Sequence, residues 1–174
     1  MRKFIYTITM FIVFLGGIYG YNYLSLSKVA SDKLKEDSRN LGVDINLHYK
    51  YYANTGTLVF NLIKVGEDKS MADVFRVLLQ TAYALKEKYF TFIELAFKGE
   101  SKFILKGEYF KALGREYKTQ NPLFTMRTLP ENVLDMDEKN VFSKWTGGFL
   151  GVYARQMQDF NEFNKMWYLS DISG

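Results

Sequence analysis

The first 24 residues form one long apolar run, MRKFIYTITMFIVFLGGIYGYNYL, which opens with Arg2 and Lys3 and contains no acidic side chain. A short basic end followed by a hydrophobic run is typical of a segment that enters a membrane. Cleavage as a signal peptide and retention as a single-pass anchor are both open, and the missing Ala-x-Ala pattern favours the anchor. We therefore expect a cell-membrane protein, or a periplasmic or secreted one if the leader is cleaved.

The end of this run bears on its depth and orientation. It reaches the length of about 17 to 25 residues that spans hydrocarbon only when Tyr19, Tyr21 and Tyr23 are counted, and tyrosine suits the membrane interface. The basic amino terminus favours a domain outside the cytoplasm, whereas basic residues that follow the run favour the reverse. We expect the first orientation.

Beyond the run, residues 25–42 are mostly polar and charged. They predict a solvated helix or a spacer that lifts the domain from the membrane, with Gly42 as a natural helix stop. Residues 43–174 are then expected to form a single folded domain.

The strongest helical pattern follows Ser70. Apolar residues recur at helical spacing from Met71 to Leu85, opposite a polar side, which predicts an amphipathic helix. Ser70 followed by Asp73 resembles a capping box and places the start of the helix near Ser70. Residues 90–97 then form an aromatic and β-branched run that is apolar on both faces, as in a central strand. We expect this helix and strand to form the centre of the core.

Alternating apolar and polar positions predict two hairpins. Residues 45–52 and 58–63 alternate on either side of Asn54-Thr55-Gly56, which supplies turn chemistry. Residues 102–106 are expected to return antiparallel to the strand at 90–97. Four strands are thus expected before residue 107.

The last third of the chain mixes helical and extended patterns. We expect a short helix over residues 107–117, a fifth strand over 123–128 and an exposed loop over 129–139. A second apolar stripe at mostly helical spacing, from Trp145 to Trp167, predicts a helix that closes over the sheet. The fold expected is α+β, a mainly antiparallel sheet of about five strands with helices packed on one face, after an N-terminal hydrophobic membrane segment.

Composition narrows the functions that such a domain can have. The 174 residues, 48% of them hydrophobic, suffice for one core and an appendage. The net charge of +4 comes from scattered basic residues, and nucleic-acid binding is not expected because its usual signature is a clustered basic face. The chain has no cysteine and one histidine, so thiol chemistry is excluded and neither a metal site nor a cofactor is expected. The glycines near residue 147 lack a phosphate-binding motif.

Glu94 is the best single candidate for a site residue, because it interrupts the apolar strand at 90–97. A buried ionised carboxylate is costly unless it is paired, protonated or at an open edge. Arg127 and Arg76 are possible partners, and Arg76 also follows Asp73 by three residues. If the protein is a hydrolase, Glu94 and Glu108 are the candidate catalytic carboxylates, because paired carboxylates serve glycosidases.

The surplus of tyrosine is the remaining signal. Tyrosine combines contact area with a polar tip, which favours binding surfaces, and we take Tyr49, Tyr51 and Trp145 as further binding candidates. The leading hypothesis is an exported or inner-membrane-anchored envelope protein, not an enzyme, whose domain binds another envelope protein. The alternatives are a small envelope hydrolase and a carrier that holds an apolar ligand between the last helix and the sheet.

Overall fold

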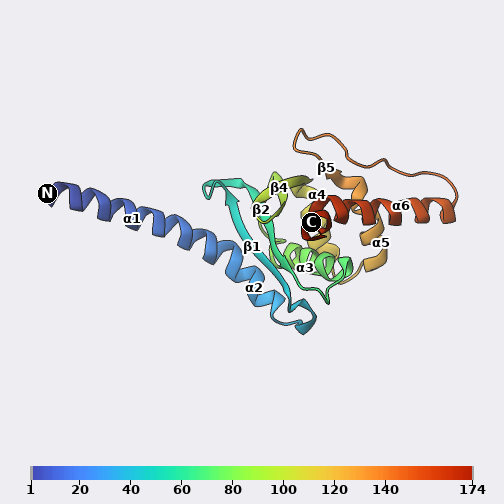
Figure 1. The fold of residues 1–174 in the computed structure, drawn as a ribbon, viewed down its shortest axis with the longest axis horizontal. Helices are drawn as coiled ribbons and strands as arrows, with labels where there is room; N and C mark the ends of the chain where they lie inside the picture. Colours follow the sequence, from blue (N-terminus) through green and yellow to red (C-terminus); the bar gives the residue numbers. More distant parts are fainter. Residues whose placement is uncertain (1, 174) are drawn as a thin grey trace.

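The computed structural model describes residues 2–173, which form one α+β domain and a long helix that projects from it (Figure 1). The helix is α1 (Arg2–Asn22), and it continues through a π-helical turn, η1 (Tyr23–Ser27), into α2 (Lys28–Leu34). Side chains of α1 from Ile5 to Leu15 are exposed, whereas Leu26 and Ala30 are buried in the core. The first part of the predicted spacer is therefore helical and packs against the domain.

The sheet contains five strands in the order β1-β2-β3-β4-β5. Their bounds are β1 (Val43–Lys50), β2 (Asn54–Val65), β3 (Phe92–Phe97), β4 (Glu100–Lys106) and β5 (Val133–Leu134). The β1–β2, β3–β4 and β4–β5 pairs are antiparallel, but β2 and β3 are parallel. The sheet is mixed, and the expectation of a mainly antiparallel sheet is wrong. The reason is the crossover helix between β2 and β3, which returns the chain to the end of the sheet where β2 began.

That crossover is α3 (Met71–Ala84), and it begins where the sequence predicts. The backbone N–H of Ser70 donates to Asp73 Oδ2 at 2.8 Å, as part of a capping box. Helix α4 (Gly107–Glu116) packs against α3 at Gly114, where the two backbones come close together. These two helices supply much of the layer that covers the sheet.

The structure corrects three predictions about individual elements: the position of one turn, the type of one segment and the location of the fifth strand. The β1–β2 turn lies at residues 51–53, because Asn54 already pairs with Lys50 in the sheet. Residues 123–128 are helical, within α5 (Pro122–Thr128), since Pro122 suits the first helical turn and the Asn121 side chain accepts from the N–H of Leu123. The fifth strand is β5, which lies inside the predicted exposed loop and has two buried residues.

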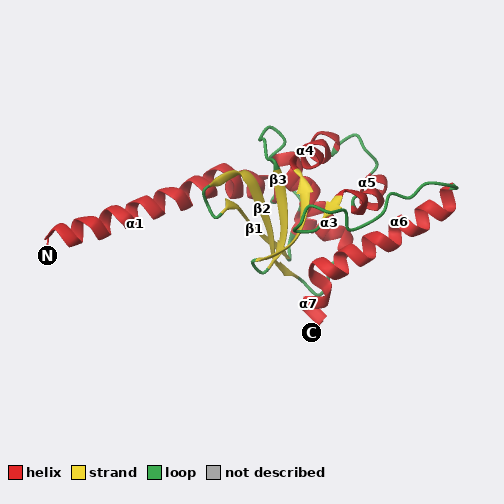
Figure 2. Cartoon of the chain, turned by 90° about the horizontal axis from the view of Figure 1, so that it is seen from above, coloured by secondary structure: helices red, strands yellow, loops and turns green. Residues whose placement is uncertain are grey.

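The chain ends in a helical segment that completes the core. It comprises α6 (Phe149–Asn164), the π-helical turn η4 (Lys165–Leu169) and α7 (Ser170–Ser173), with single 3-10 turns η2 (Ser38–Asn40) and η3 (Pro130–Asn132) earlier in the chain. Trp167 packs against Phe60 of β2 with 5.9 Å between ring centroids. Figure 2 shows α1 leaving the domain at the β1 side of the sheet and α6 on the opposite side.

The two faces of the sheet differ. One face contributes Leu58, Phe60, Ile93 and Leu95 to the main core, together with side chains from α2, α3, α4 and η4. Because side chains alternate along a strand, Glu94 lies on the other face, where its neighbours in register are Val59 of β2 and Ile104 of β4. The helices α3 and α4 thus cover the face of the sheet opposite to the one from which Glu94 points.

Candidate functional site

Glu94 is buried and fully engaged. Its side chain is 6% exposed, and Oε1 accepts a hydrogen bond from Lys50 Nζ at 2.5 Å while Oε2 accepts one from Ser101 Oγ at 2.9 Å. Lys50 comes from β1 and Ser101 from β4, so the carboxylate joins three strands. The hydrogen bond to Glu94 raises the pKa of Lys50, which keeps the ammonium charged. This arrangement satisfies both carboxylate oxygens, as a structural ion pair does.

The structure does not bring Glu94 to its expected partners. Arg76 donates to Asp73 Oδ1 and to the carbonyl of Arg39, each at 2.8 Å. Arg127 donates to Gln156 at 2.6 Å and lies over the Phe124 ring. Both arginines are therefore engaged elsewhere.

Glu108 is likewise separate from Glu94. It is exposed in the first turn of α4, a helix of the layer that packs on the main core, whereas Glu94 points from the opposite face of the sheet. The two carboxylates proposed for a hydrolase do not face each other.

Asp73 and Arg76 instead form a polar junction at the start of α3. Burial disfavours the charged carboxylate of Asp73, but hydrogen bonds from Ser70 and the nearby Arg76 outweigh it and lower the pKa of Asp73 to about 2. Farther along α3, Gln80 donates to Asp37 at 3.0 Å and accepts from Asn40 at 2.6 Å. These contacts hold the chain after α2 against α3.

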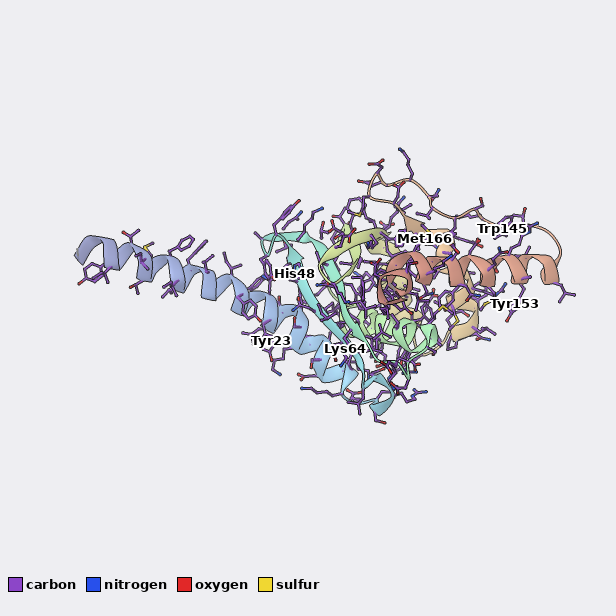
Figure 3. All side chains as sticks on the ribbon, in the orientation of Figure 1. Tyr23, His48, Lys64, Trp145, Tyr153 and Met166 are labelled. Carbon is purple, nitrogen blue, oxygen red and sulfur yellow. The ribbon has the colours of Figure 1, made fainter. Side chains whose placement is uncertain are left out.

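The aromatic candidates do not share one surface. Tyr49 is buried and stacks on Tyr21 of α1, with 5.8 Å between the ring centroids, whereas Tyr51 is 81% exposed at the β1–β2 turn. Trp145 donates to Asp159 at 2.6 Å, near α6. Figure 3 shows Trp145 and Tyr153 at one end of the domain and His48 at the other. A single aromatic binding face is therefore not formed by these residues.

A large groove lies beside β1, which is an edge strand. It is a groove of about 560 Å³ between the helical segment α1–α2 and β1. Its lining includes Tyr23, Ala30 and Leu34 from the helix and Ile45, Leu47 and His48 from the strand. The groove thus has walls of mixed polarity, with apolar side chains from both the helix and the strand, and a strand backbone along one side.

The backbone of β1 is only partly capped along this groove. Asn22 accepts from the N–H of Tyr49 at 2.8 Å, and Ser27 donates to the carbonyl of Leu47 at 2.9 Å. Groups of alternate residues point the same way in an antiparallel strand, so the N–H of Leu47 and the carbonyl of Ile45 also point toward the helix. Within residues 2–173, the helix forms hydrogen bonds with the N–H of Tyr49 and the carbonyl of Leu47. It forms none with the N–H of Leu47 or the carbonyl of Ile45.

The sequence did not single out two residues that matter here, Asn22 beside the groove and Lys50 beside Glu94. Asn22 is a polar residue at the end of an apolar run, and it is 2% exposed because its side chain ties α1 to β1. Lys50 alternates with the core residues of β1 and so shares a sheet face with Glu94, a signal that was present in the pattern. Among the described side chains, no group of three histidine, aspartate or glutamate residues is placed to hold a metal ion.

Comparisons of the chain with protein-family models, with curated proteins and with solved structures gave no match.

Proposed function

We propose that this protein is a membrane-anchored binding module whose domain, outside the cytoplasm, holds an extended segment of another envelope protein. The observation that carries the proposal is the edge of β1, where the N–H of Leu47 and the carbonyl of Ile45 face a groove lined by both apolar and polar side chains. An extended peptide that adds to a sheet edge gains main-chain hydrogen bonds, and pockets for its alternate side chains give specificity.

The anchor in this proposal is α1. It forms the apolar part of a continuous helix, Ile5–Leu34, that is long and apolar enough to cross a membrane, and its described apolar side chains from Ile5 to Leu15 are exposed in the protein alone. Exposed apolar surface on this scale is costly in water and favourable in hydrocarbon. The basic Arg2 and Lys3 at its start support a cytoplasmic amino terminus.

The geometry of Glu94 favours binding over hydrolysis. A general acid or base must reach the substrate, but both oxygens of Glu94 are already bonded and Glu108 does not face it. A carrier function is also less supported, since Phe163 and Trp167 pack against Phe103 and Phe60 where the last helix meets the sheet. The groove beside β1 is the better binding site.

Site-specific photo-crosslinking in intact membranes tests this proposal. A benzoylphenylalanine at position 41, which lines the groove and is 73% exposed, should give one discrete adduct with a partner protein. The same probe at position 150, which is 80% exposed on α6, is the matched control and should not give that adduct. Ser31→Trp, which fills the groove from the helix side, should abolish it.

Capture alone does not establish the mode of binding, so a second measurement is needed. A synthetic peptide with the sequence of the crosslinked segment should slow hydrogen exchange at the amide of Leu47, which points into the groove. Equal adducts from positions 41 and 150, or an adduct that survives Ser31→Trp, would overturn the proposal.

A further inference from the structure

The turn between β1 and β2 has an unusual sequence for its backbone geometry. Tyr51 and Tyr52 have φ angles of 54° and 60°, and the N–H of Ala53 donates to the carbonyl of Lys50 at 3.3 Å. Two central residues with positive φ define a type I′ turn, which strongly prefers Asn-Gly. A left-handed backbone costs an ordinary residue about 1–2 kcal/mol. The backbone conformation of the turn therefore does not favour tyrosine at either position.

These tyrosines are also exposed. Tyr51 is 81% exposed and Tyr52 is 43% exposed, although the Tyr52 ring stacks on His48 with 4.6 Å between centroids. A tyrosine ring is apolar along its body and polar at its tip, so it is favoured where hydrocarbon meets water. The chemistry of the turn is that of an interfacial contact.

The turn lies beside the end of α1. The carbonyl of Tyr52 accepts a hydrogen bond from Asn22 Nδ2 at 2.9 Å, and Figures 1 and 2 both show the hairpin next to the carboxyl-terminal part of α1. Between them is an apolar groove of about 370 Å³, lined by Phe14 and Ile18 of α1 and by Ala53 of the turn. The turn is thus held at the level of the last turns of α1.

The length of α1 indicates which part of the bilayer surrounds the β1–β2 turn. The helix has 21 residues, so it is about 31 Å long, close to the roughly 30 Å thickness of a hydrocarbon core. The helix continues past Asn22, but it is buried against the domain at Leu26 and Ala30, so only α1 is free to enter hydrocarbon. If α1 spans the bilayer, it needs its whole length to do so, and its last turn near Tyr19 and Asn22 lies at the lipid headgroups. The hairpin turn beside that end then meets the headgroups as well.

We infer that the β1–β2 turn is a second membrane contact, with Tyr51 and Tyr52 in the headgroup region of the leaflet where α1 emerges. The groove between α1 and Ala53 faces the lipid and accepts acyl chains. This inference rests on the proposed anchoring by α1, and the two contacts together fix the tilt of the domain relative to the membrane.

The absence of cysteine from the sequence permits a direct test with single-cysteine variants of the full chain. Tyr51→Cys and Thr55→Cys report on the turn, and Phe11→Cys reports on the anchor. Lys98→Cys is the matched control, because it is an exposed turn residue with a φ of 49° at the other end of the sheet. Leu62 of β2 pairs with Phe97, so Lys98 lies about 25 Å along β2 from the tyrosine turn.

Each variant is labelled with an environment-sensitive fluorophore and reconstituted into phosphatidylcholine and phosphatidylglycerol vesicles that contain lipids with a nitroxide at the headgroup or on the acyl chain. Headgroup nitroxides should quench position 51 at least twofold more strongly than position 98, and position 55 should follow position 51. Acyl-chain nitroxides should quench position 11 most strongly.

The outcomes separate the two proposals. Strong acyl-chain quenching at position 11 with equal, weak quenching at positions 51 and 98 would overturn the second contact and leave the anchor in place. Failure to quench position 11 would overturn the anchor itself, and with it the inference. Unchanged far-ultraviolet circular dichroism of the labelled variants confirms that each one is folded.

Discussion

Gly114 sits where α4 crosses α3, and substitution by alanine tests how closely these helices pack. A Cβ atom at Gly114 would lie 2.3 Å from the carbonyl oxygen of Ala82 and 2.7 Å from its carbonyl carbon. Both are backbone atoms, so no rotation of a side chain relieves the clash. The helices must separate, and overpacking of this kind costs about 1–3 kcal/mol. Alanine gains about 1 kcal/mol over glycine in a helix, which offsets part of the cost.

Because both contacts are with backbone atoms, the upper end of that range, about 3 kcal/mol, applies, and subtracting the helix propensity leaves Gly114→Ala with a free energy of unfolding lower by about 2 kcal/mol. Gly151→Ala is the matched control, because Gly151 lies in the first turn of α6 and a Cβ there meets nothing within 4 Å. Alanine has less conformational freedom than glycine in the unfolded chain, so this second variant should be more stable by about 0.5–1 kcal/mol. The same substitution should thus change stability in opposite directions at the two sites.

Urea unfolding of the full chain in a mild detergent, followed by circular dichroism, measures both variants. If Gly114→Ala proves as stable as the parent, or more stable, then the close approach of α3 and α4 does not constrain this position and the packing argument fails. A loss of stability in both variants would also refute it, since backbone contact would then not distinguish them.

Three further predictions concern the polar contacts. Lys50→Met leaves the buried Glu94 with one hydrogen bond and should lower the free energy of unfolding by about 1–3 kcal/mol. Adding Glu94→Gln to Lys50→Met should recover part of that loss. Urea titrations in which the two changes are simply additive would contradict the ion pair. Asn22→Ala removes side-chain bonds to both β1 and the turn, so hydrogen exchange at the amide of Tyr49 should speed up at least tenfold, whereas exchange within α3 serves as the unchanged reference. Asp73 has a pKa of about 2 in the folded chain against 3.8 normally, so its contribution is complete above about pH 4 and is lost as the pH falls toward 2. Stability measured against pH in Asp73→Asn should show a shallower acid decline, and an unchanged decline would assign the effect to other carboxylates.

The centre of the fold was predictable because local signals agree there. Ser70 and Asp73 mark the start of α3, the apolar spacing defines its buried side, and the run at 90–97 contains β3. The parallel pairing of β2 with β3 was missed because the strand patterns alone carry no direction, although the intervening helix favours a crossover. Strand β5 has only two residues, too few for alternation to identify.

The candidate site was only partly predictable from the sequence, because its contacts join residues that are far apart along the chain. Glu94 stood out because a carboxylate in an apolar strand violates a simple burial rule. Its partner Lys50 is 44 residues away and approaches across β2, so the pairing depends on the order of strands rather than on spacing. The groove beside β1 depends on how the helix after Asn22 lies against the sheet edge, which no periodicity in that helix specifies.

The passage from α1 through η1 into α2 is continuous helix, and it is fixed to the core by Leu26 of η1 and Ala30 of α2. A domain on such a stiff shaft does not swing freely as one on a flexible tether would. In the proposed arrangement the groove stays at a constant height just above the lipid surface. Its occupant must then be a stretch of chain that runs close to the same membrane, which limits the search for a partner to proteins resident in it.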